Sequence, residues 1–296
     1  MNDTRLIGFA DYAEPGRRLA EALCVPFTLA EIHRFPDGER KLRLPPPLAA
    51  HLIFCRSLND PDHKLIELLL AAGSARDNGA RRLTLVTPYL AYMRQDIAFS
   101  PGEAVSQRVI GGLLAAHFDA VITVDAHLHR IHSLAQAIPL KHARNLSAAG
   151  SIGEFIAGHH HNPLLLGPDQ ESKQWVAAVA RAAGGLDFGI ASKTRHGDRL
   201  VDVVLPPLDY RGRQVVLVDD VASTGRTLAT AARHLHEAGA ASVNCVVTHG
   251  LFVGDALETL QQAGVETIWS TDSIPHPSNS IALSALLAAA VQQAAD

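Results

Sequence analysis

The stretch VVLVDDVASTGRT, from Val215 to Thr227, joins two adjacent carboxylates to a run of small and hydroxylated residues. Four apolar residues suited to a buried strand precede Asp219 and Asp220, whose like charges repel each other and are costly to bury without partners. Ser223–Thr227 then supply a flexible glycine, hydroxyl groups and the first amides of a following helix, which suit a phosphate monoester. The neighbouring carboxylates favour hydroxyl hydrogens or a divalent cation. A sugar phosphate offers both patterns at once.

The context of this loop favours ligand binding over a purely structural role. Either Asp220 or Ser223 alone would be expected to cap a helix, because such residues often do. The whole string, however, follows an apolar strand, and ligands of open α/β sheets bind beyond the carboxyl ends of the strands. We therefore expect a sugar phosphate to contact Asp219, Asp220, Ser223, Thr224, Gly225, Arg226 and Thr227.

Elements that could position this loop run along the whole chain. Short β-type runs alternate with longer Ala/Leu-rich stretches, and several runs are continuously apolar, as in a parallel sheet covered on both faces. This alternation predicts an α/β fold. The expected strands are His51–Cys55, Arg82–Thr87, Ala120–Val124, Pro163–Leu166, Phe188–Ala191, Leu200–Val204, Val215–Val218 and Ser242–Thr248. The expected helices are Asp62–Asn78, Glu103–His117, Ser172–Ala183 and Thr227–Ala238.

A shift in composition near Lys141–Gly153 divides the chain, because a second strand–helix series begins there. We expect two architecturally similar domains, residues 1–147 and 148–296, with the last helix a candidate to pack back on the first domain. The length of 296 residues is ample for two domains of ordinary size.

Composition narrows the class of protein and of partner. Hydrophobic residues make up 47% and charged residues 19% of the chain, as in a globular protein, and the net charge of −4 offers no general attraction to nucleic acid or to anionic membranes. The three cysteines are far apart and form no CxxC pair. Neither a signal peptide nor an apolar run of bilayer length is found. A reduced, cytoplasmic protein is expected.

Several further motifs carry a family resemblance in collinear order. VVLVDDVASTGRT resembles the phosphoribosyl diphosphate (PRPP) motif of type I phosphoribosyltransferases and of ribose-phosphate diphosphokinases. RFPDGERKLRL (Arg34–Leu44), TPYLAYMRQD (Thr87–Asp96), PGEAVSQRVIGGLL (Pro101–Leu114) and VITVDAHLHRIHSL (Val121–Leu134) resemble segments of the diphosphokinases alone, and LLLGPDQES, ASKTRHGD and STDSIP continue the match. The resemblance implies two phosphoribosyltransferase-like domains, each a mainly parallel sheet flanked by helices.

The resemblance implies an enzyme that transfers the diphosphoryl group of ATP to the C1 hydroxyl of ribose 5-phosphate, giving PRPP and AMP. In the first domain it assigns ATP to a loop that the family takes from a neighbouring subunit, and to two segments that follow strands. It therefore also implies a homo-oligomer, a dimer or a multiple of dimers. The implied ATP-binding residues are Phe35, Asp37, Glu39, Arg94, Gln95, Asp96 and His127.

In the second domain the resemblance implies the catalytic cations and part of a metal site. Lys193 and Arg195 correspond to the basic catalytic motif, where phosphoryl transfer needs positive charge as negative charge builds up. Thr194 replaces the usual middle basic residue. The resemblance also implies Mg²⁺ as the cofactor, with His127 and Asp169 as metal residues.

Two departures from the family pattern leave alternatives open. IAFSP, which follows Asp96, is shorter and less basic than the flexible segment of bacterial and animal members and looks like the archaeal type. PDQES puts Gln170 and Glu171 where the family has small residues and glycines. The alternatives are a phosphoribosyltransferase that consumes PRPP, and a weakly active regulatory homologue. Regulation by phosphate or ADP, the nucleotide preference and the oligomer size are left undetermined.

Overall fold

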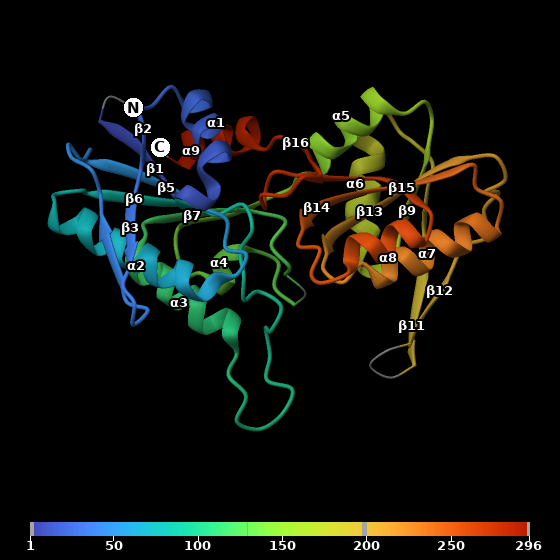
Figure 1. The fold of residues 1–296 in the computed structure, drawn as a ribbon, viewed down its shortest axis with the longest axis horizontal. Helices are drawn as coiled ribbons and strands as arrows, with labels where there is room; N and C mark the ends of the chain where they lie inside the picture. Colours follow the sequence, from blue (N-terminus) through green and yellow to red (C-terminus); the bar gives the residue numbers. More distant parts are fainter. Residues whose placement is uncertain (1–2, 129, 197–199, 295–296) are drawn as a thin grey trace. The chain divides into compact units, whose positions relative to one another are not determined.

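The chain folds into two compact units, and each contains one six-stranded parallel sheet (Figure 1). The computed structural model describes residues 3–128, 130–196 and 200–294, without the side chains of residues 193–196 and 200–202. One unit consists of Met1–Leu146 together with Leu283–Asp296, and the other of Ser147–Ala282. The α/β class expected from the sequence is confirmed.

In the first unit the sheet has the strand order β2-β1-β5-β6-β7-β8, and a separate antiparallel hairpin is formed by β3 and β4. The sheet strands are β1 (Thr4–Gly8), β2 (Phe27–Leu29), β5 (His51–Cys55), β6 (Arg82–Val86), β7 (Ala120–Val124) and β8 (His142–Leu146). The hairpin strands are β3 (Glu31–Arg34) and β4 (Arg40–Arg43). The helices are α1 (Ala13–Leu23), α2 (Pro61–Asp77), α3 (Ser106–His117), α4 (Leu134–Ala137) and α9 (Ser284–Ala294), with a 3₁₀ turn η1 (Ala10–Tyr12).

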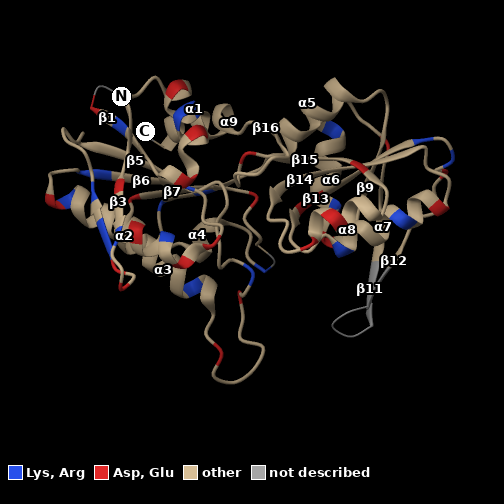
Figure 2. Cartoon of the chain, in the orientation of Figure 1, with Lys and Arg blue, Asp and Glu red and all other residues tan. Residues whose placement is uncertain are grey.

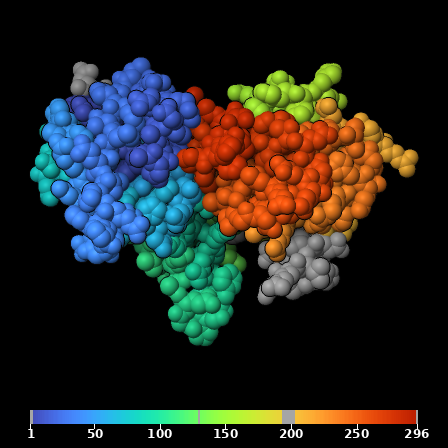
Figure 3. All heavy atoms as spheres, in the orientation of Figure 1, coloured from blue at the N-terminus to red at the C-terminus, as the bar shows by residue number. Residues whose placement is uncertain are grey.

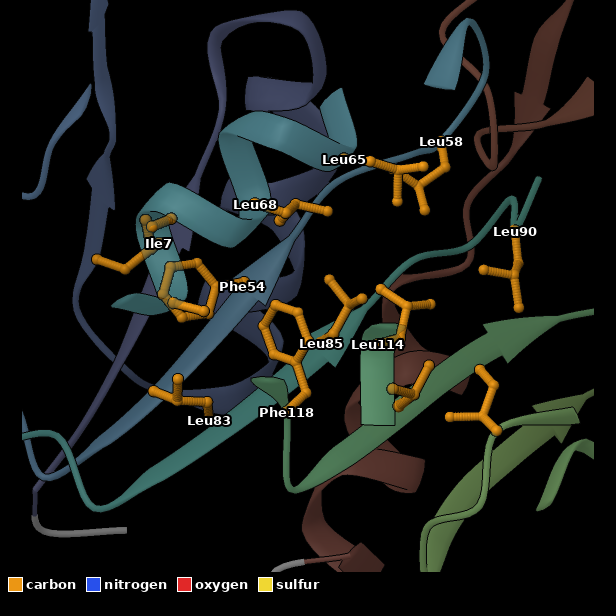
Figure 4. Packing of buried hydrophobic residues seen from close by; sticks show 14 of the residues in the cluster. Ile7, Phe54, Leu58, Leu65, Leu68, Leu83, Leu85, Leu90, Leu114 and Phe118 are labelled. Atoms are coloured by element: carbon orange, nitrogen blue, oxygen red, sulfur yellow. The ribbon is translucent and has the colours of Figure 1, made fainter. Parts of the chain in front are cut away.

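Apolar side chains from the strands and from α2 and α3 form the core of this unit (Figure 4). Phe54 of β5 meets Phe118, which follows α3, in an edge-to-face arrangement with ring centroids 5.9 Å apart. Leu83 and Leu85 of β6 are fully buried beside them. Burial on this scale explains why β5, β6 and β7 read as continuous apolar runs in the sequence.

In the second unit the sheet has the strand order β10-β9-β13-β14-β15-β16, and β11 pairs with β12 in a separate antiparallel ribbon. The strands are β9 (Leu164–Gly167), β10 (Phe188–Ile190), β11 (Ser192–His196), β12 (Leu200–Val204), β13 (Gln214–Ala222), β14 (Ser242–Gly250), β15 (Val265–Thr271) and β16 (Asn279–Ile281). The helices are α5 (Ala149–His159), α6 (Lys173–Ala182), α7 (Arg226–Glu237) and α8 (Ala256–Gln262), with a 3₁₀ turn η2 (Gln170–Ser172).

The last helix, α9, belongs to the first unit although it follows the second in the chain. Its end is held there by two polar contacts. Arg144 of β8 donates to Gln293 Oε1 at 2.8 Å, and Arg82 of β6 donates to the carbonyl of Ala294.

Charged residues of both signs are interspersed over the helices and loops of the two units (Figure 2). Among the helices of the described residues, none combines the length and the hydropathy that a membrane span requires.

Candidate active site

The strand that carries Asp219 and Asp220 is longer than the sequence predicts. β13 continues through both acids to Ala222, because its ladder with β14 goes on: Asp219 pairs with Val247 and Val221 with His249. The expected strand end at Val218 is therefore wrong by four residues. Both acids are half-buried and lie within the last part of the strand, not at the start of the loop.

The turn from β13 into α7 is built around Gly225. This residue is the N-cap of α7 and has a left-handed backbone, with φ of 68°. Glycine has no side chain that could cap the helix, so α7 has no side-chain cap at this position. Ser223 and Asp220, either of which could have capped the helix, do not occupy the N-cap position. A Cβ at Gly225 would lie 3.2 Å from the carbonyl oxygen of Ala256 and from Leu260 Cγ, both on α8. Gly225 is thus needed for its backbone conformation and for packing against α8.

Hydroxyl groups and amides surround the start of α7. Ser223 and Thr227 are half-buried, whereas Thr224 and Arg226 are exposed. The carbonyl of Ser223 accepts a hydrogen bond from the amide of Val253 at 2.9 Å, which ties the loop to the segment after β14. The first amides of α7 have no partner within the helix, so this end carries the partial positive charge that binds anions.

A third carboxylate lies close to the pair on β13. Burial raises the pKa of Asp219 well above its usual range, and the negative charges of Asp220 and Asp169 raise it further. Asp169 follows β9, which is the neighbour of β13 in the sheet. The carboxyl ends of these two parallel strands therefore gather negative charge that a cation would offset.

Asp169 also organises the PDQES turn. Its Oδ1 accepts hydrogen bonds from the amides of Glu171 at 3.1 Å and Ser172 at 3.3 Å, and the Ser172 hydroxyl donates to the carbonyl of Asp169 at 2.6 Å. Gly167 lies against this turn, because a Cβ there would overlap Ser172 Oγ. The side chains of Gln170 and Glu171, which depart from the family pattern, are exposed.

Lys193 and Arg195 lie on β11, where they pair with Val203 and Val201 of β12. Their side chains are outside the described residues, so their catalytic role stays a prediction.

In the first unit, two segments that follow adjacent parallel strands carry expected ATP residues. The segment after β6 holds Arg94, which is exposed, and Gln95, whose carbonyl accepts from the amide of Gln107 at 3.2 Å. The Gln107 side chain donates to the carbonyl of Met93 at 3.1 Å. The N-terminus of α3 thus fixes this part of the segment. The residues between Asp96 and the start of α3 project from the surface of this unit (green in Figure 3).

Asp96, the third expected ATP residue of this segment, has a buried side chain. Its side chain is only 2% exposed, and its Oδ1 accepts from Arg130 at 2.6 Å. Arg130 follows β7, so this ion pair joins the two segments that carry the expected ATP residues. Arg130 had no expected role in the sequence.

The segment after β7 places His127 through a tight turn. Asp125 has a positive φ of 42°, and its amide donates to the carbonyl of Leu146 at 2.8 Å. The next amide, of Ala126, donates to Asn145 Oδ1 at 2.8 Å. His127 is half-buried just beyond this turn. β8 therefore fixes the turn that carries Asp125 and His127, a contribution that the local sequence does not reveal.

The remaining expected ATP residues form the tip of the β3–β4 hairpin. The amide of Phe35 donates to the carbonyl of Glu39 at 2.9 Å, and Asp37 Oδ1 accepts from the amide of Glu39 at 3.1 Å. Phe35 is 39% exposed, and His33 meets its ring edge-on. The aromatic face of Phe35 is thus available for stacking on a planar ligand.

Both halves of the chain match models of known protein families. The sequence model described as the N-terminal domain of ribose phosphate pyrophosphokinase matches residues 5–117, and the phosphoribosyl transferase domain model matches residues 142–267. The ribose-phosphate pyrophosphokinase of Methanopyrus kandleri is 36% identical over 284 residues, 94% of each chain. The chain belongs to the ribose-phosphate pyrophosphokinase family.

Other relatives support the same assignment. The enzyme of this name from Methanosarcina acetivorans is 34% identical over 93% of this chain and 95% of its own, and that of Methanothermobacter thermautotrophicus is 31% identical over 96% and 98%. The crystal structure of phosphoribosylpyrophosphate synthetase from Mycobacterium smegmatis superposes with a TM-score of 0.83 over 99% of this chain and 98% of that one, at 23% identity. This last likeness concerns the fold.

A polar cluster that the sequence did not reveal lies beside β13, the strand that carries Asp219 and Asp220. His249, which pairs with Val221, is buried, and its Nδ1 lies 2.9 Å from Ser273 Oγ. The Ser273 hydroxyl donates to the carbonyl of Thr248 at 2.8 Å. Ser273 belongs to STDSIP, so this contact ties the segment after β15 to the end of β14. The resemblance of STDSIP to the family was the one available signal.

Proposed function

We propose that this chain transfers the β,γ-diphosphoryl group of ATP to the C1 hydroxyl of ribose 5-phosphate, giving PRPP and AMP. The observation that carries the proposal is the match of residues 5–117 to the N-terminal domain of ribose phosphate pyrophosphokinase, alongside the phosphoribosyl transferase domain at residues 142–267. A phosphoribosyltransferase that consumes PRPP would account for the second match only. The proposal gives both halves of the chain a substrate.

The second unit binds ribose 5-phosphate in this proposal. The 5-phosphate accepts hydrogen bonds from the first amides of α7 and from the neighbouring hydroxyls, since this end attracts anions. Asp219 and Asp220 accept from the ribose hydroxyls, which offsets their mutual repulsion. The residues at the phosphate are Ser223, Thr224, Gly225, Arg226 and Thr227.

The first unit binds ATP. Phe35 stacks on the adenine ring while Asp37 and Glu39, at the same hairpin tip, accept from its amino group. Arg94 contacts phosphate oxygens and Gln95 reads the purine edge, because a guanidinium and an amide suit these partners. The remaining two residues assigned to this side are Asp96 and His127.

Mg²⁺ is the proposed cofactor, and the residues present fit it. Carboxylate oxygens are the ligands that Mg²⁺ prefers. Burial raises the pKa of Asp219, and the negative charges of Asp220 and Asp169, which a cation would offset, raise it further. Within the described ranges no group of three or more His, Cys, Asp or Glu side chains could hold a metal ion. Mg²⁺ commonly completes its coordination with substrate phosphates and water, so one or two residues such as Asp169 or His127 suffice. When bound, it would neutralise charge on the phosphate oxygens.

Transfer itself depends on positioning and on positive charge. The C1 hydroxyl must lie in line with the β-phosphorus of ATP, and the developing negative charge needs cations nearby. We assign that role to Lys193 first and to Arg195 second. A homo-oligomer and a cytoplasmic location, both expected from the sequence, stay predictions.

Product analysis tests the proposal against both alternatives. The chain is incubated with ATP, ribose 5-phosphate and Mg²⁺, and AMP and PRPP are measured by ³¹P NMR. The proposal predicts that AMP and PRPP form in equal amounts, and only when ribose 5-phosphate is present. Consumption of supplied PRPP with a nucleobase would instead favour the phosphoribosyltransferase, and nucleotide binding without turnover would favour the regulatory homologue.

A further inference from the structure

The β3–β4 hairpin is not a member of the main sheet, so other contacts must fix its direction. Ile32 pairs with Leu42, and both pack against the core of the first unit. Nearer the tip, Arg34 pairs with Arg40, directly beside the turn that carries Phe35. Apolar packing therefore holds the base of the hairpin, and the tip needs a separate anchor.

Arg40 supplies a link from the hairpin to helix α2. Its Nε lies 3.2 Å from Glu67 Oε1, and the side chains are 19% and 3% exposed. Glu67 Oε2 lies 2.7 Å from Arg56 Nη1, and the side chain of Arg56 is 4% exposed. Glu67 thus lies between two guanidinium groups in a largely dry environment, where ion pairs are screened far less than at the surface.

The partners of Glu67 are themselves fixed. Arg56 Nε donates to both carboxylate oxygens of Asp11, at 3.0 and 3.2 Å, and its guanidinium lies 4.4 Å from the centre of the Phe9 ring. Lys64 Nζ lies 2.9 Å from Asp11 Oδ2 and donates to the carbonyl of Ser57 at 3.0 Å. The anchor that Arg40 reaches is therefore part of a network of ion pairs rather than a single carboxylate.

A second ion pair on the same strand provides a contrast. Arg43 of β4 lies 2.8 Å from Glu31 of β3, with the side chains 59% and 55% exposed. This pair joins the two strands of the hairpin to each other and does not reach the body of the unit. Exposed pairs of this kind contribute little to stability.

We propose that Arg40 is a positioning residue for nucleotide binding. Through Glu67 and Arg56 it holds the hairpin on α2, so that the tip presents Phe35, Asp37 and Glu39 in one fixed direction. The inference rests on the proposed function for the role of the tip, whereas the anchoring itself can be measured without activity. Arg40 does not touch the nucleotide in this account.

Arg40→Met tests the anchor, since it removes the charge and keeps an unbranched apolar stem, and Arg43→Met is the matched control. We expect Arg40→Met to lower kcat/KM for ATP by about 10²-fold, as for a misplacement of about 1 Å. The KM for ribose 5-phosphate should change much less. Hydrogen exchange of a peptide covering residues 31–43 should become faster in Arg40→Met, with little change in Arg43→Met. Arg40→Lys should recover part of both properties.

Two results would overturn the proposal. One is that Arg40→Met and Arg43→Met are alike in hydrogen exchange of residues 31–43. The other is that exchange differs while kcat/KM for ATP is the same in both variants. If the wild-type chain itself forms no AMP, the proposed function fails, and the exchange measurement still decides whether Arg40 anchors the hairpin. Thermal unfolding of each variant verifies that the unit is folded.

Discussion

Two neighbouring glycines of α3 predict opposite effects of the same substitution. A Cβ at Gly111 would overlap the carbonyl oxygen of Ala137 and lie 2.7 Å from its carbonyl carbon, whereas a Cβ at Gly112 would meet nothing within 4 Å. Ala137 belongs to α4, which follows the segment with His127. Close approach of α3 to α4 therefore requires glycine at position 111 only, and Gly112→Ala is a matched control within the same helix.

The magnitudes follow from packing and helix propensity. Alanine in place of an exposed helical glycine stabilises by up to about 1 kcal/mol, so Gly112→Ala should raise Tm by about 2–4 °C. Overpacking costs about 1–3 kcal/mol, and the obstacle at Gly111 is main chain that no rotamer change removes. Gly111→Ala should therefore lose about 2 kcal/mol and lower Tm by about 4–8 °C. Differential scanning calorimetry measures both, and equal stabilisation by the two substitutions would refute the close contact.

Asp219→Asn should raise stability at neutral pH while weakening ribose 5-phosphate binding in calorimetric titration. The pKa of Asp219 is higher in the folded chain than in the unfolded chain. Ionisation of Asp219 therefore destabilises the fold as the pH rises above the pKa that this group has in the unfolded chain. The gain from Asn should then disappear in acid, and a gain independent of pH would contradict it. Lys193→Ala should lower kcat by orders of magnitude with a smaller change in nucleotide affinity, since its charge acts in the transition state; an unchanged kcat with a raised KM would make it a binding residue. Phe35→Ala should weaken the binding of ATP but not that of ribose 5-phosphate. If subunits exchange and share a site, mixing this variant with Lys193→Ala should restore some activity. No recovery despite exchange would argue against a shared site.

Elements with strong apolar patterns could be predicted from the sequence. Some of their ends could not, because contacts with other elements set them. β5 and β7 have the expected bounds, and α2 and α7 each begin and end one residue before those expected. The expected end of β13 at Val218 was wrong because Asp219 and Asp220 were taken to terminate the strand. The ladder with β14 carries them onward, and pairing between distant strands is not visible in a local pattern.

The β3–β4 hairpin was missed for a related reason. Its strands read EIHR and RKLR, with charged residues in most positions and little apolar alternation to indicate a strand. What fixes it includes the ion pair of Arg40 with Glu67, two residues on different elements. The motifs were enough to propose which residues bind ATP. Their burial, such as that of Asp96 against Arg130, depends on tertiary contacts that motifs do not encode.

The fate of the β-phosphorus of ATP tests the central claim most directly. The chain is supplied with ATP labelled with ³²P at the β-position, ribose 5-phosphate and Mg²⁺, and the products are separated. Diphosphoryl transfer predicts that the label leaves the adenine nucleotide and appears in PRPP, with one unlabelled AMP formed for each PRPP. Label that stays in ADP while ribose 5-phosphate gains only the γ-phosphoryl group, or label that remains in ATP, would contradict the account.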